Sequence, residues 1–98
     1  MATKTASLKS IFRQFVELVD PIEEVQYVVA PEPGVDIYTF IKERNDAVVH
    51  QIFEQEYAML RNFPDLLVDF HIFFLEGRDV QDFINPLPRL VFSRAKSG

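Results

Sequence analysis

The stretch of sequence that decides the fold covers residues 66–75 and reads LLVDFHIFFL. Its alternate positions are uniformly apolar, and a period of two is typical of a β-strand with one face in a core. The row predicted to point at the rest of the domain contains Val68, Phe70, Ile72 and Phe74. The row predicted to lie on the opposite, outer face of the sheet contains Leu67, Asp69, His71, Phe73 and Leu75.

Two more strands are predicted before this one. Residues 25–30 are rich in β-branched side chains, and residues 35–41 (VDIYTFI) alternate between two faces. Between them, residues 31–34 (PEPG) combine restricted and free backbone angles, which favours a hairpin loop and antiparallel pairing. In the second strand the residues expected to face the core are Val35, Ile37 and Ile41, and those expected to face outward are Asp36, Tyr38 and Phe40.

Two helices are predicted from apolar residues that recur every three or four positions. The first covers about residues 7–19 and ends at Asp20-Pro21, because proline disfavours helical geometry in the residue before it. The second covers about residues 45–62, with Asn45 or Asp46 as its cap. Its buried side chains are predicted to be Val49, Ile52, Phe53, Tyr57 and Leu60, with Phe63 at its exit, and its outward ones to be His50, Glu54, Gln55 and Arg61.

The predicted element order is α-β-β-α-β. A short helix over residues 79–84 follows, and residues 90–92 could form a last edge strand. Short connections around the second helix favour a right-handed crossover, which makes the strands it joins parallel. We therefore predict a single α+β domain over residues 1–98, a two-layer sandwich with a small mixed sheet and the helices on one face. Its ordered core would cover about residues 7–92, between polar and flexible termini.

Composition limits the class of protein. The length of 98 residues suits one domain, and a hydrophobic fraction of 48% favours a folded core over disorder. The absence of cysteine excludes a disulfide scaffold and a cysteine nucleophile. No stretch approaches the ~18 consecutive apolar residues of a membrane span, and residues 1–10 lack the apolar region of a secretory signal. We expect a cytoplasmic protein without membrane contact.

The net charge of −5 is unevenly distributed along the chain. All fifteen Asp and Glu lie between Glu17 and Asp82, whereas both ends are basic. We expect the basic ends to be solvated or to pair with the acidic body. Aromatic residues on an open sheet are typical of a base-stacking surface, but acidic neighbours repel phosphates. We therefore expect no binding to nucleic acid.

The predicted outer face of the sheet is too apolar for comfortable exposure. The residues expected to form an interface there are Tyr38, Phe40, Leu67, Phe73 and Leu75. Three explanations stay open: residues 90–92 fold over this face, two copies of the chain associate face to face or edge to edge, or a ligand or another protein binds. Dimer formation would also help a small chain, which buries only about 60–65% of its unfolded surface.

One constellation on the outer face could carry chemistry. Asp36, Asp69 and His71 would share that face, and such a group could hold a divalent cation or act as acid and base. The same spacing arises on any alternating strand, where an Asp near a His is more often an ion pair. His50 lies one helical turn before Glu54, which predicts a contact between them. No glycine-rich phosphate loop of the form GxxxxGK or GxGxxG occurs.

The element order over residues 7–92 resembles the small nucleotidyltransferase-like proteins. Members of that family bind a metal and a nucleotide with an Asp-x-Asp on one strand and a third Asp on a neighbouring strand. The resemblance implies that Asp36 matches the first of these and Asp69 the third, with Mg²⁺ as the cofactor. Tyr38 stands at the second position and cannot replace a carboxylate on a hard cation. Residues 30–34 replace the family's Gly-Ser turn, so the resemblance implies a degenerate copy that transfers no nucleotide.

We therefore expect a non-catalytic interaction or assembly domain that forms a homodimer and needs no cofactor. An unidentified protein partner is a further expectation. The alternative is a metal-dependent nucleotide-binding or nucleotidyl-transfer domain that uses Asp36, Asp69 and His71.

Overall fold

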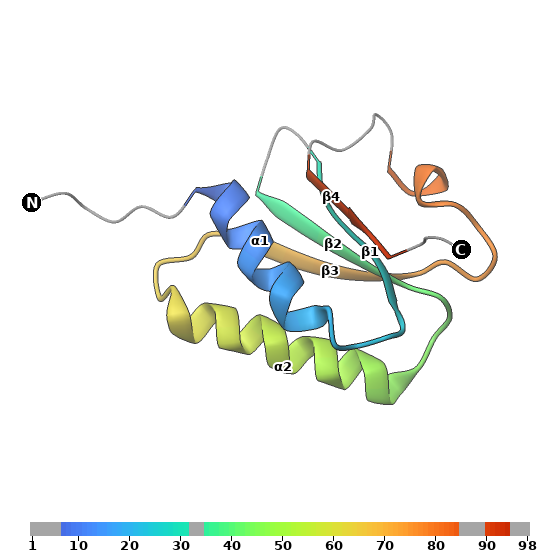
Figure 1. Ribbon diagram of the computed structural model, residues 1–98, viewed down its shortest axis with the longest axis horizontal. Coiled ribbons are helices and arrows are strands. Elements are labelled where there is room, and N and C mark those ends of the chain that lie inside the picture. Colours follow the sequence, from blue (N-terminus) through green and yellow to red (C-terminus); the bar gives the residue numbers. More distant parts are fainter. Residues whose placement is uncertain (1–6, 32–34, 85–89, 95–98) are drawn as a thin grey trace, which may run out of the picture.

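The computed structural model describes residues 7–31, 35–84 and 90–94. Within these residues, two helices pack on one face of a mixed sheet (Figure 1). This architecture confirms the predicted α+β class and element order. Most of the predicted hairpin loop, the prolines before the last strand and both predicted flexible ends lie outside the described residues.

The sheet has the strand order β3-β2-β1-β4. Its strands are β1 (Val25–Ala30), β2 (Asp36–Ile41), β3 (Asp69–Phe74) and β4 (Leu90–Ser93). β1 pairs antiparallel with β2 and with β4, and β2 pairs parallel with β3. The parallel pair follows from the helical crossover between β2 and β3, as predicted from the sequence. The last strand forms as expected, on the edge opposite β3.

Both helices begin at a capping side chain. In α1 (Leu8–Val19), the Ser7 hydroxyl accepts a hydrogen bond from the Ser10 amide at 3.1 Å. In α2 (Asp46–Asn62), the Asn45 carbonyl oxygen accepts from the amides of Ala47 and Val48. These bonds satisfy amides that have no partner within the helix. Neither described helix is long and apolar enough to cross a membrane.

The helices cover the face of the sheet that the sequence pattern assigns to them. The core they share with the sheet includes the predicted inner row of β3 and its neighbours, namely Ile37, Ile41, Val68, Phe70, Ile72 and Phe74. Phe15 of α1 packs against Phe70, with 5.0 Å between the ring centroids. The outer row of β3 therefore faces away from both helices, which confirms the predicted strand polarity.

The prediction of which α2 side chains are buried is wrong in part. Phe53, Tyr57 and Leu60 are 46%, 62% and 41% exposed, and the residues that α2 buries in the core are Val48, Ile52 and Met59. The helix carries apolar side chains on two adjacent faces, so periodicity alone does not decide which face meets the sheet. The predicted contact of His50 with Glu54 is present, with 3.4 Å between Nε2 and Oε2.

Arg94, directly after β4, binds residues between the end of α1 and the start of β1. Its Nε donates to the carbonyl oxygen of Val25 at 2.7 Å, and its Nη2 donates to the carbonyl oxygen of Asp20 at 2.8 Å. An ion pair of 3.2 Å joins its Nη1 to Oδ1 of Asp20. At this position a basic residue near the end of the chain pairs with the acidic body, as expected from the charge distribution.

Candidate functional site

The candidate site is the outer face of the sheet, on the side that the helices leave open. Three aromatic rings from β2 and β3 form a row there. The ring centroids of Tyr38 and Phe73 lie 5.2 Å apart, and those of Phe40 and Phe73 also lie 5.2 Å apart. Tyr38 also meets the imidazole of His71 edge to face at 4.9 Å. The alternation of the strands places these rings together, as the sequence pattern predicts.

Part of this face is covered by the chain itself. After β3, the chain forms a 3-10 helix, η1 (Val80–Asp82), in place of the predicted short helix over residues 79–84. Phe83 then packs on Phe40 and Phe73, with centroid distances of 5.4 and 5.6 Å. The guanidinium carbon of Arg78 lies 4.5 Å from the centroid of Phe83. Cover by residues 90–92 was one of the three explanations left open by the sequence; in the structure residues 80–84 pack on this face, and residues 90–92 extend the sheet as the predicted edge strand.

Because of this cover, the five residues predicted to form an interface differ in exposure. Phe40 and Leu75 are buried within the chain and are not part of its exposed surface. Tyr38 and Phe73 are half-buried at the margin of the cover. Leu67, just before β3, is 81% exposed. The open part of the outer face therefore lies toward the start of β2 and β3.

The predicted acidic cluster forms a pair of interacting residues rather than a cluster of three. Nε2 of His71 lies 3.0 Å from Oδ1 of Asp36, and both side chains are partly exposed. Asp69 stands opposite Asp36 in the register of the two strands and is exposed. Among the described residues, no group of three or more His, Cys, Asp and Glu side chains could hold a metal ion. The geometry therefore supports an Asp–His pair at the sheet surface.

Glu56 of α2, in the helical layer on the other side of the sheet, is a titratable residue that the sequence analysis missed. Its Oε2 is buried and has no hydrogen-bond partner in the described part of the chain. Burial raises the pKa of Glu56 to about 7, against the opposing attraction of His71. Its position one turn after the buried Ile52 and three residues before Met59 is the signal that could have identified it.

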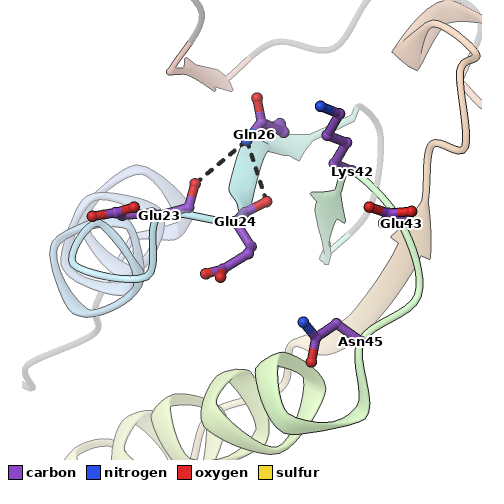
Figure 2. A pocket seen from close by; sticks show the side chains of 6 residues that line it. All are labelled: Glu23, Glu24, Gln26, Lys42, Glu43 and Asn45. Atoms are coloured by element: carbon purple, nitrogen blue, oxygen red, sulfur yellow. Dashed lines mark hydrogen bonds between the residues drawn. The ribbon is translucent and has the colours of Figure 1, made fainter.

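A separate hollow of about 340 Å³ lies between the start of β1 and the start of α2. Figure 2 shows the side chains around it, which are Glu23, Glu24, Gln26, Lys42, Glu43 and Asn45. Nε2 of Gln26 donates to the carbonyl oxygens of Glu23 and Glu24, at 3.4 Å each. Small-molecule sites are mostly apolar with a few convergent polar groups. This open, charged hollow does not have that character.

The sequence matches no protein-family model, and searches of curated proteins and of solved structures find no similar chain. The resemblance to the nucleotidyltransferase-like proteins therefore stays a prediction from element order and from Asp36 and Asp69. What the fold defines is the class, a small α+β domain with a mixed sheet and both helices on one face.

Proposed function

We propose that this chain is a non-catalytic assembly domain that forms a homodimer through the aromatic and acidic surface around β3. The residues of this surface are Tyr38, Leu67, Asp69, His71 and Phe73. The observation that carries the proposal is that the aromatic row is only partly covered: Tyr38 and Phe73 stay partly exposed, and Leu67, just before β3, is 81% exposed. Apolar surface of this kind is typical of an interaction site.

The incomplete cover of the outer face supports association. Residues 80–84 bury Phe40 but leave Tyr38 and His71 partly exposed. A second copy of the chain would supply the missing apolar contacts without any change of fold.

The arrangement of His71 favours recognition over catalysis. Its ring is held by Asp36 on one side and by the edge-to-face contact with Tyr38 on the other. A fixed imidazole beside an aromatic ring presents a defined shape and hydrogen-bonding pattern to a partner. Specific interfaces have this mixed aromatic and polar character.

Sedimentation equilibrium of the purified chain at micromolar concentrations tests the proposal. We expect a monomer–dimer equilibrium, and we expect Leu67→Lys to shift it toward the monomer because a charge then replaces an apolar contact. Val91→Lys is the matched control, since Val91 is an exposed apolar residue on the opposite edge strand β4. A wild-type chain that stays monomeric throughout this range contradicts the proposal.

A further inference from the structure

We infer that the dimer interface is the free edge of β3. The β3 strands of the two copies would pair antiparallel, with the two Phe70 residues opposite each other, so that the two sheets form one continuous sheet. The inference rests on the proposed function, because it specifies the geometry of that self-association. It distinguishes edge-to-edge pairing from a face-to-face contact between the outer faces.

The backbone of β3 is open on one side. The amides of Asp69 and Leu75 donate to the carbonyl oxygens of Val35 and Ile41 in or beside β2, at 3.0 and 2.9 Å. Because successive residues of a strand point their backbone groups to opposite sides, those of the alternate residues point away from β2. These residues are Phe70, Ile72 and Phe74. The strand order places no described strand on that side, so their amides and carbonyls are free to pair.

This edge lacks most of the features that usually prevent sheet edges from pairing. Such features include lysine and other charged side chains, proline, a bulge and a very short strand, and of these β3 carries only the charged Asp69. β3 has the sequence DFHIFF over six residues, with neither lysine nor proline, and its register with β2 is regular. The other edge strand, β4, is four residues long. The longer edge is therefore the better template for a second strand.

Polar side chains on facing positions select the direction and register of the pairing. Antiparallel pairing about Phe70 places Asp69 of each copy opposite His71 of the other, and Leu67 opposite Phe73. Within one chain, Asp69 lies opposite the like charge of Asp36, and the Asp69 carboxylate makes no hydrogen bond within the described residues. A carboxylate can accept a hydrogen bond from an imidazole on the facing position, and such polar cross-strand pairs stabilise a strand pair. A second copy therefore supplies the partner that Asp69 lacks.

Neighbouring registers are less favourable. Pairing about His71 would place the two imidazoles opposite one another. Pairing about Ile72 would place Asp69 opposite the buried Leu75 and leave the carboxylate without a partner. Of these three registers, the one about Phe70 is the one that pairs Asp69 of each copy with His71 of the other.

An antiparallel strand pair keeps corresponding faces of the two sheets on the same side. Its two-fold axis is perpendicular to the sheet, so the helices of both copies would lie on one face of the joined sheet. The helix α2 carries exposed apolar side chains, among them Phe53 and Leu60.

Proline substitution tests the edge directly. Ile72→Pro removes an amide that points to the open side of β3, and we expect it to abolish the dimer. Val91→Pro is the matched control, because the amide of Arg94 donates to Gln26 and alternation therefore turns the amide of Val91 away from β1. We expect Val91→Pro to keep the wild-type dimer in sedimentation equilibrium, with circular dichroism confirming that both variants are folded.

Amide hydrogen exchange gives a second measurement that needs no substitution. We expect the amides of Phe70, Ile72 and Phe74 to exchange more slowly as the concentration of the wild-type chain rises. The amides of Val91 and Ser93 should show no such dependence. A dimer in which exchange at the three β3 amides is independent of concentration overturns the edge-to-edge interface but leaves the proposed function standing. A monomer at every concentration overturns both.

Cross-linking tests the register, because the chain contains no cysteine of its own. We expect a mixture of Asp69→Cys and His71→Cys chains to form a mixed disulfide dimer, since facing residues lie within disulfide reach. Each variant alone should not cross-link, because identical positions are then about 8 Å apart between Cα atoms. Efficient cross-linking of His71→Cys with itself would overturn the register about Phe70.

Discussion

Thr39 is a fully buried polar residue on the helix-facing side of β2, between Ile37 and Ile41. Its hydroxyl oxygen has no hydrogen-bond partner in the described residues. An unsatisfied buried hydroxyl costs about 1–3 kcal/mol, so we expect Thr39→Val to increase the free energy of unfolding by about 1 kcal/mol. Urea denaturation measures this change. Thr39→Ser keeps the hydroxyl and loses a methyl group, so it should decrease stability, and a destabilised Thr39→Val would contradict the argument.

Glu56 makes stability depend on pH in a definite direction. Its pKa is 4.5 when unfolded and about 7 when folded, because burial disfavours the charged carboxylate. The folded chain therefore holds a proton that the unfolded chain releases between these values, and stability decreases as pH rises through that window. The side chain is only partly buried, so solvent screening reduces this contribution to an order of 1 kcal/mol.

Replacing Glu56 by glutamine removes this titration. We expect Glu56→Gln to have a smaller loss of unfolding free energy between pH 5 and pH 8 than the wild-type chain, measured by urea denaturation at both values. The exposed Glu17 of α1 provides the control, and Glu17→Gln should leave the wild-type difference in place. Equal pH dependence in Glu56→Gln and the wild type would show that the carboxyl is hydrated when folded.

At the scale of elements, the strands were predictable because their two rows differ in character. In β3 one row is wholly apolar, and only one orientation buries that row. The caps were predictable because Ser7 and Asn45 each precede an apolar period. These signals are local in the sequence, and each fixes the place or orientation of one element.

The buried face of α2 was not predictable from the same kind of signal. One apolar row contains Val49, Phe53 and Leu60, and the adjacent row contains Val48, Ile52 and Met59. The rotation of the helix depends on the space between α1 and the sheet, which is a property of the packed layers. The structure buries the second row and exposes most of the first.

In the candidate site, too, some contacts were predictable from local sequence and others depend on packing between elements. Pairing of Asp36 with His71 follows from two outer rows on adjacent parallel strands, so the sequence predicts it. Phe83 follows η1, in the segment after β3, and Glu56 lies on α2, in the helical layer. Their positions depend on packing between elements, so the periodicity of a single segment does not predict them.

At the scale of the whole molecule, both faces of the sheet carry large apolar side chains that burial stabilises. The two helices cover one face (Figure 1), and side chains of residues 80–84 pack on part of the other. The second cover is short, without a helix longer than the three residues of η1. Its stability therefore rests on a few side chains, of which Phe83 makes two ring contacts with the sheet and one with Arg78.

Removing this ring should expose the aromatic row. A buried Phe→Ala change costs about 3–5 kcal/mol, and for the half-buried Phe83 we expect a loss of about 2 kcal/mol in Phe83→Ala. For a domain of this size that loss lowers the Tm by roughly 10 °C, measurable by thermal unfolding. Binding of a hydrophobic dye should increase as well, because Phe40 loses its cover.

The matched control for Phe83→Ala is Phe53→Ala, the same change at a 46% exposed ring on α2. Both variants are to be measured at concentrations where the chain is monomeric, so that loss of association does not contribute to the Tm. We expect Phe53→Ala to change the Tm by a few degrees at most, since surface substitutions usually alter stability by no more than about 0.5 kcal/mol. Equal effects of the two changes, with no added dye binding in Phe83→Ala, would mean that residues 80–84 do not hold the outer face closed in solution.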